Sequence, residues 1–120
     1  MCTCTSSDSP LFDGAALPSS SHVVAVGSHE PTAREVDTEA VRRAWVVVED
    51  RPTALREAGE VVIPLKEGAI GQGHLRADLR ELVATGGVGH PPLTLFKSVG
   101  MGWQDLAVAS AAYERWQSAR

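Results

Sequence analysis

The chain has 120 residues, of which 43% are hydrophobic and 22% charged, as in a single ordinary globular domain. Its net charge is −4 and its basic residues are scattered among acidic ones, so we expect no nucleic-acid partner. No apolar run reaches the roughly 20 residues that span a bilayer, and no signal peptide is evident, so we expect a cytoplasmic protein without membrane contact.

The first half of the chain alternates predicted strands and helices. Residues 22–26 form an apolar run that ends at Gly27, which predicts a strand buried on both faces. A second strand is predicted at 45–49. Helices are predicted at 37–44, after a capping Asp37 or Thr38, and at 53–58.

The second half continues the alternation. The run 61–63, stopped by a proline, predicts a third strand, and the leucine spacing over 75–83 predicts an amphipathic helix. A fourth strand is predicted at 93–97. The last helix, 101–117, is apolar on almost every side through residue 112, so something must cover it. The whole pattern favours an α/β fold with a parallel sheet and crossover helices.

One feature of such sheets is missing from the sequence. A dinucleotide-binding domain normally opens with a strand, a Gly-x-Gly-x-x-Gly turn and a helix whose N-terminus binds the pyrophosphate. Gly71-Gln72-Gly73 lacks the third glycine at the required spacing, and no Walker pattern occurs. The residues therefore read as the second half of a Rossmann-like nucleotide-binding domain.

Three segments in order resemble the ornithine cyclodeaminase/μ-crystallin family: VVAVGSHEPTAREVD (23–37), EAGEVVIPLKEGAIG (57–71) and LTLFKSVGMGWQDLAVASAAYER (93–115). The resemblance implies chemistry with NAD(H) or NADP(H) on an amino acid or cyclic imine, in a homodimer. It covers only the C-terminal portion of the longer family members. Residues 1–92 would then be a partial NAD(P)-binding domain. Residues 93–120 would be its last strand and a helix leading back to the substrate and dimerisation domain.

The same resemblance assigns roles to the segment after the last strand. In the family this segment lies where the nicotinamide meets the substrate, so we expect Ser98 to contact the cofactor and Val99 the substrate. The alternative is that Gly100 and Gly102 only form a tight turn between strand and helix.

The first predicted strand ends in a second candidate segment. Ala25, Val26, Gly27 and Ser28 stand at the carboxyl edge of a parallel strand, where ligands bind in open α/β sheets. The resemblance implies that their backbone groups contact the cofactor. A plain strand followed by a turn is equally compatible with these residues.

His29 is the candidate catalytic residue. Ornithine cyclodeaminase has an acid/base aspartate at this position, and histidine also transfers protons near neutral pH. The replacement weakens the case for ornithine as substrate, and an ordinary loop histidine is the alternative. Arg34 either supplies a charge to the cofactor or pairs with Glu35 or Asp37. Thr3 and Thr5 are weaker candidates for bordering the cofactor.

No metal site is predicted. The other histidines, His22, His74 and His90, share no spacing with acids or cysteines, and we interpret them as surface or packing residues. The only two cysteines are too few for structural zinc.

Two functional hypotheses remain open. The first is an enzyme of NAD(P)-dependent amino-acid or imine chemistry in the complete protein: a cyclodeaminase, an amino-acid dehydrogenase or a ketimine reductase. The second is a truncated, inactive fragment or a ligand-binding protein like μ-crystallin. Without a phosphate-binding half, the 120 residues alone are expected to have no turnover and to associate through uncovered surfaces.

Overall fold

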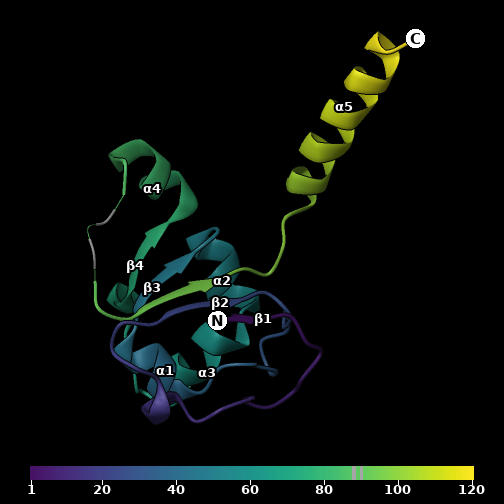
Figure 1. The fold of residues 1–120 in the computed structure, drawn as a ribbon. Helices are drawn as coiled ribbons and strands as arrows, with labels where there is room; N and C mark the ends of the chain where they lie inside the picture. The colour runs from purple at the N-terminus through teal and green to yellow at the C-terminus, as the bar shows by residue number, and fades with distance from the viewer. Residues whose placement is uncertain (88, 90) are drawn as a thin grey trace.

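The computed structural model describes residues 1–87, 89 and 91–120, which form one parallel sheet with helices (Figure 1). The strands are β1 (Cys2–Thr3), β2 (His22–Ala25), β3 (Trp45–Val48), β4 (Leu75–Asp78) and β5 (Thr94–Lys97). The helices are α1 (Thr38–Arg43), α2 (Arg51–Glu57), α3 (Gly59–Lys66), α4 (Leu79–Thr85) and α5 (Gly102–Ser118), with the 3-10 turns η1 (Gly14–Ala16) and η2 (Gln72–His74). The strand order is β1-β2-β5-β3-β4, and every pairing is parallel, which confirms the predicted α/β class.

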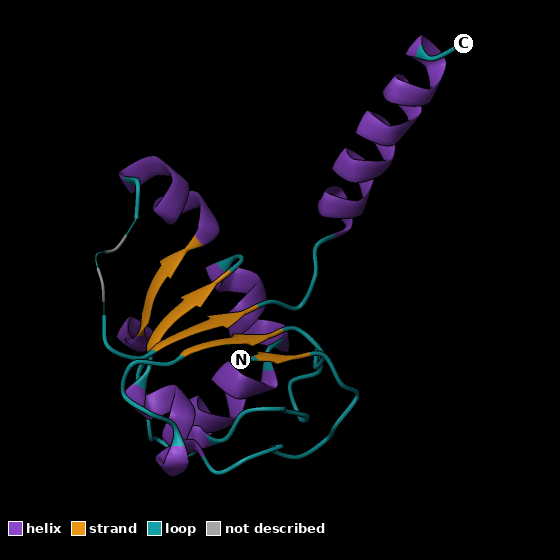
Figure 2. Ribbon diagram, in the orientation of Figure 1, coloured by secondary structure: helices purple, strands orange, loops and turns teal. Residues whose placement is uncertain are grey.

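The core lies on the face of the sheet that α1 and α3 cover (Figure 2). Alternate strand residues point to this face and are fully buried: Val23, Ala25, Val46, Val48 and Leu95. They meet small and branched helix residues, so valine and alanine make up most of the core, with a few leucines and one isoleucine. Burying each valine contributes about 1.5 kcal/mol or more, and the layer is held together by many such contributions.

The opposite face of the sheet is only partly covered. It carries a hollow of ≈ 380 Å³ lined mainly by apolar residues of β3, β5 and α4. At β2, His22 is exposed and Val24 is half-buried. The prediction that residues 22–26 are buried on both faces is therefore wrong for the described part of the chain.

Several predicted elements are confirmed by the structure. Helix α1 begins after Asp37, whose carboxylate accepts a hydrogen bond from the backbone N–H of Ala40 at 2.8 Å. Asp50 caps α2 in the same way, with the N–H of Thr53 at 3.0 Å. These caps satisfy N–H groups that have no partner within their own helix.

The predicted strand 61–63 is wrong, because these residues lie within helix α3. The run of valine and isoleucine favours a strand, but β-propensity depends strongly on context and its cost in a helix is small. The helix buries Val61 in the core and brings Glu60 to the carboxyl edge of the sheet. Pro64 is accommodated inside α3, and its carbonyl accepts a hydrogen bond from Ala69.

The predicted helix 75–83 is wrong in its first half. Leu75 and Ala77 are buried on alternate positions of strand β4, and the helix begins only after Asp78. Asp78 accepts a hydrogen bond from the N–H of Glu81 at 2.9 Å, while the Glu81 carboxylate accepts from the N–H of Asp78 at 2.9 Å. This Asp-x-x-Glu capping box is readable in the sequence and marks the true start of α4.

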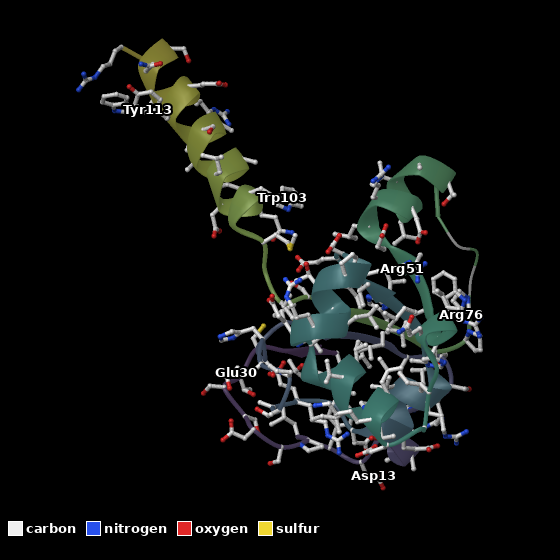
Figure 3. The ribbon with its side chains drawn as sticks, turned by 180° about the vertical axis from the view of Figure 1, so that it is seen from behind. Asp13, Glu30, Arg51, Arg76, Trp103 and Tyr113 are labelled. Carbon is white, nitrogen blue, oxygen red and sulfur yellow. The ribbon has the colours of Figure 1, made fainter. Side chains whose placement is uncertain are left out.

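The last helix is confirmed as α5, but nothing in the described chain covers it. Figure 3 shows Trp103 and Tyr113 on a helix that projects away from the sheet. Trp103 is 60% exposed and Tyr113 58% exposed. None of the described helices is long and apolar enough to cross a bilayer.

The structure tests the predictions made for Arg34 and for the histidines outside the candidate site. Arg34 does not pair with Glu35 or Asp37, because it donates to Thr38 at 2.6 Å and lies 3.7 Å from the carboxylate of Glu67. Glu35 instead turns into the protein. His74 packs as expected, with its Nε2 2.7 Å from the carbonyl oxygen of Val41. His90 lies outside the described residues.

Candidate active site at the carboxyl edge of the sheet

The carboxyl ends of β1, β2 and β5 bring the predicted site segments together. Strand β5 lies beside β2, with Ala25 opposite Lys97. The N–H of Ser98 donates to the carbonyl of Ala25 at 3.1 Å, and the N–H of Val26 donates to the carbonyl of Thr3 at 3.0 Å. Residues about 70 positions apart in the sequence therefore form one continuous edge.

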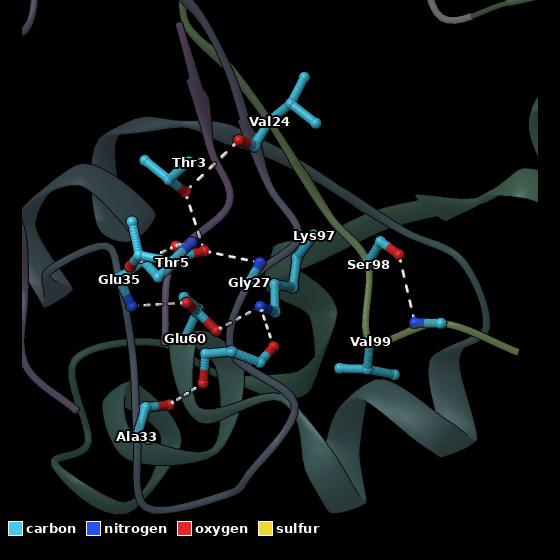
Figure 4. Close-up of polar contacts among 12 residues, drawn as sticks. Thr3, Thr5, Val24, Gly27, Ala33, Glu35, Glu60, Lys97, Ser98 and Val99 are labelled. Carbon is cyan, nitrogen blue, oxygen red and sulfur yellow. Dashed lines mark hydrogen bonds and ion pairs between the residues drawn. The ribbon is translucent and has the colours of Figure 1, made fainter. Parts of the chain in front are cut away.

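A fully buried carboxylate, Glu35, holds two of these strand ends (Figure 4). One of its oxygens accepts from the N–H and hydroxyl of Thr5 at 2.5 and 2.9 Å. The other accepts from the hydroxyl of Thr3 at 3.0 Å and the N–H of Gly27 at 2.8 Å. Glu35 thus connects the end of β1 to the turn after β2. Thr3 and Thr5 have a structural partner that the sequence did not suggest.

These contacts also decide the ionisation of Glu35. Burial by itself raises the pKa of a carboxyl group, because it penalises the charged form. The hydrogen bonds from Thr5, Gly27 and Thr3 stabilise that charged form and outweigh burial, so the pKa of Glu35 lies below its ordinary value of 4.5. Glu35 is therefore a carboxylate at neutral pH.

A buried ion pair joins the third strand end to the same cluster. The ammonium of Lys97, on β5, lies 3.0 Å from the carboxylate of Glu60, and neither side chain is accessible to solvent. Lys97 also donates to the carbonyl of Ser28 at 2.5 Å. Glu60 accepts from the N–H of Glu35 at 2.8 Å, so the ion pair and the Glu35 carboxylate form one network (Figure 4).

The predicted segment 25–28 is held almost entirely by this network and its neighbours. The hydroxyl of Ser28 donates to the carbonyl of Ala33 at 2.8 Å, and Ser28 is 5% exposed. The N–H of Gly27 is taken by Glu35. Of the four residues, Val26 has the most exposed side chain, at 37%. The segment is thus a rigid ledge that presents Val26 to solvent.

The segment at 98–100 has a different character. Ser98 and Val99 are both half-buried, and Val99 packs against the hydrophobic core. The Ser98 hydroxyl oxygen accepts a hydrogen bond from the N–H of Gly100 at 3.3 Å. Gly100 has a φ of +78°, and a Cβ placed there would meet no atom within 4 Å. The turn therefore needs glycine for its backbone conformation, and it leaves open space beside Ser98.

His29 lies one residue beyond the ledge in the exposed loop after β2. It lines a hollow of ≈ 90 Å³ together with Ser6, Ser7, Asp8 and Glu30, among others. This hollow does not include Ser98. The described chain therefore places His29 in a hollow that it shares with Gly27 and Ser28 of the ledge but not with Ser98.

Sequence reasoning missed the residues that organise this edge. Glu60 and Lys97 occur inside apolar runs, at positions where a polar side chain is expected to need a partner. That placement was the only indication in the sequence that Glu60 and Lys97 need partners. The sequence did not predict that they pair with each other, because they are 37 positions apart and Glu60 lies in a helix of which residues 61–63 were predicted as a strand.

No three His, Cys, Asp or Glu side chains within residues 1–87, 89 and 91–120 lie close enough together to hold a metal ion. A small, exposed apolar residue and a half-buried serine lie at adjacent strand ends, and a fixed hydrogen-bonded network supports them.

A substitution at Gly27 tests how tightly this ledge is built. A Cβ at residue 27 would lie 2.1 Å from the backbone oxygen of Thr5 and 2.5 Å from a carboxylate oxygen of Glu35. We expect Gly27→Ala to lower the free energy of unfolding by about 1–3 kcal/mol, because backbone has to move. Gly71→Ala is the control, since its added Cβ meets no atom within 4 Å. Urea unfolding compares the two variants, and equal stabilities would contradict the close packing.

The sequence matches the ornithine cyclodeaminase/mu-crystallin family over residues 1–120. A Delta(1)-pyrroline-2-carboxylate reductase of Colwellia psychrerythraea is 35% identical over 118 residues, which are 96% of this chain and 37% of the relative. The ketimine reductase mu-crystallin of Mus musculus is 34% identical over 119 residues, 98% of this chain and 36% of the relative. Thermococcus litoralis Delta(1)-pyrroline-2-carboxylate reductase, solved with NADH and L-proline, has a TM-score of 0.92 at 36% identity, over 98% of this chain and 38% of that chain. The chain thus spans little more than a third of these relatives.

Proposed function

Because the chain belongs to the ornithine cyclodeaminase/mu-crystallin family, we propose that it forms the nicotinamide-binding rear part of an NAD(P)-dependent imine reductase. The observation that carries the proposal is the edge where Ala25 and Ser98 meet by a 3.1 Å hydrogen bond. The similarity to a reductase solved with NADH and L-proline supports a cyclic imine of Delta(1)-pyrroline-2-carboxylate type as the substrate.

The described residues fit the nicotinamide end of such a cofactor. Gly100 leaves open space beside Ser98, and Val26 presents an exposed apolar surface at the neighbouring strand end. When bound, the nicotinamide would supply or accept the hydride. Residues 1–120 contain no Gly-x-Gly-x-x-Gly turn, so in this proposal another part of the complete protein binds the pyrophosphate. The division into a cofactor part, 1–92, and a returning part, 93–120, remains part of the proposal, as does a homodimer.

Each candidate residue then has a distinct task. The ledge Ala25–Ser28 supports the cofactor with its backbone fixed, which limits motion at the reacting centre. Ser98 contacts the cofactor, and Val99 borders the substrate. His29 gives a proton to the imine nitrogen as hydride adds to the carbon, and takes a proton from that nitrogen in the reverse reaction. A histidine fits this task because its charge changes near neutral pH.

The second candidate is an inactive fragment without enzymatic turnover, and one observation favours it. Nothing in the described chain covers α5, whose residues include Leu106 at 66% and Trp116 at 50% exposure. A chain of these residues alone is expected to bind no dinucleotide and to associate through that helix. The cyclodeaminase reaction is a third candidate. It is weaker, because ornithine cyclodeaminase has an aspartate at the position of His29.

A hybrid enzyme tests the proposed function. Residues 1–120 replace the matching segment of the Thermococcus litoralis reductase, and NADH oxidation is followed with Delta(1)-pyrroline-2-carboxylate. We expect turnover by the hybrid. His29→Ala is expected to lower kcat/KM by about 100-fold and to remove the pH dependence that a proton donor gives.

His22→Ala serves as the matched control, because His22 is exposed at the amino end of β2, away from the ledge. It should leave kcat/KM unchanged. A folded hybrid without turnover would contradict the proposed activity. An active hybrid in which both histidine variants behave alike would contradict only the role of His29.

A further inference from the structure

A single carboxylate, Glu49, holds the turn between β5 and α5. One of its oxygens accepts from two successive backbone N–H groups, those of Val99 at 3.1 Å and Gly100 at 3.0 Å. Its other oxygen accepts from the side-chain amide of Gln104 at 2.7 Å. The Gln104 carbonyl in turn accepts from the N–H of Met101 at 3.3 Å. Three successive backbone N–H groups of the turn before α5 are thereby satisfied through Glu49 and Gln104.

The position of Glu49 makes it well suited to fix this turn. It directly follows β3, which pairs with β5, and its carbonyl accepts from the N–H of Leu79 at 3.4 Å. Its backbone is therefore anchored in the sheet. Every residue of α5 except Gln104 is exposed, so within the described chain the helix brings little packing of its own to the turn. The neighbouring acid, Asp50, has a different task as the cap of α2.

We propose that Glu49 is a positioning residue that sets the place of Ser98 and Val99 at the reacting centre. This inference rests on the proposed function. Glu49 does not touch cofactor or substrate in it. It fixes the backbone N–H groups of Val99 and Gly100, and thereby the direction in which Ser98 faces the open space beside Gly100. A shift of about 1 Å at such a contact lowers turnover by about 100-fold.

The first measurement uses the 120-residue chain. In Glu49→Met the side chain keeps a similar length but loses both accepting oxygens. We expect amide hydrogen exchange at Val99 and Gly100 to become at least about 10-fold faster, since the free energy of holding them falls by roughly 1.4 kcal/mol. Glu57→Met is the control, because Glu57 pairs only with Arg56 among the described contacts. Unchanged exchange in Glu49→Met overturns the proposal.

The second measurement separates positioning from stability and uses the hybrid enzyme. Glu49→Met should lower kcat by about 10- to 100-fold with little change in the KM for the imine and in Tm. A normal kcat in an active hybrid overturns the proposal, and so does a fall in kcat that only follows a fall in Tm. An inactive unsubstituted hybrid contradicts the proposed function instead, while faster exchange in the 120-residue chain still supports the hold of Glu49 on the turn.

Discussion

Replacing Lys97 with methionine is expected to lower the free energy of unfolding by about 3–5 kcal/mol. The ammonium of Lys97 is the charged partner of Glu60 at 3.0 Å, and both side chains are inaccessible to solvent. Removal of the lysine leaves a buried carboxylate without a counter-charge and the carbonyl of Ser28 without its donor. Methionine fills a similar volume, so the loss reports charge and not packing. Urea unfolding at pH 7 measures it.

A double substitution checks the physical cause. In Lys97→Met with Glu60→Gln, the amide oxygen still accepts from the N–H of Glu35, and the uncompensated charge is gone. We expect the double variant to recover a large part of the lost stability, since replacing a buried pair by neutral groups is often close to neutral. Lys66→Met, at an exposed position, is the matched control for the lysine change. A double variant as unstable as the single one would contradict the ion-pair account.

Glu35→Gln is expected to have the second largest effect, about 3 kcal/mol at pH 7. Each carboxylate oxygen of Glu35 accepts from a backbone N–H group, one from Thr5 and the other from Gly27. An amide has only one accepting oxygen, so either orientation of glutamine places two donors against each other. The backbone N–H groups of Thr5 and Gly27 can only donate, so one of them must move away from the NH₂ group of the glutamine. Amide exchange at Thr5 and Gly27 is expected to rise with the loss of stability.

The pH dependence supplies an independent check on Glu35. Because its pKa is lowered on folding, the stabilisation is fully present above about 4.5 and is lost as the pH falls from there through the pKa of the folded state. The unsubstituted chain should therefore lose stability on acidification in this range, and Glu35→Gln should lose less. Glu57→Gln is the control, since Glu57 pairs with Arg56 at the surface. Equal acid slopes for Glu35→Gln and the unsubstituted chain would contradict this assignment.

Both effects bear on function as well as stability. Lys97 immediately precedes Ser98, and Glu35 holds the N–H of Gly27 within the ledge. Loosening either residue is expected to disturb the candidate site, because Glu35 and Lys97 hold the strand ends that carry it. The site is rigid for the same reason that these substitutions are costly: its buried charges are held by an ion pair and by hydrogen bonds.

The sequence by itself determined the fold class, the family resemblance and the elements with strong local signals. The helices predicted at 37–44 and 53–58 are both confirmed, and Asp37 caps the first of them as expected. The segments 25–28 and 98–99 were also identified as ends of parallel strands, and they lie together. Such features depend on short-range periodicity, capping and a recognisable order of motifs, which are all present in the linear chain.

Only the tertiary structure decided the form of residues 61–63 and 75–78 and the partners of the buried charges. Residues 61–63 are helical because that conformation buries Val61 and directs Glu60 to Lys97, a gain that outweighs a small local preference for a strand. Glu35 likewise meets Thr3 and Thr5, which lie 32 and 30 positions away in the sequence. Contacts of this kind depend on which strands become neighbours, and no local pattern carries that information.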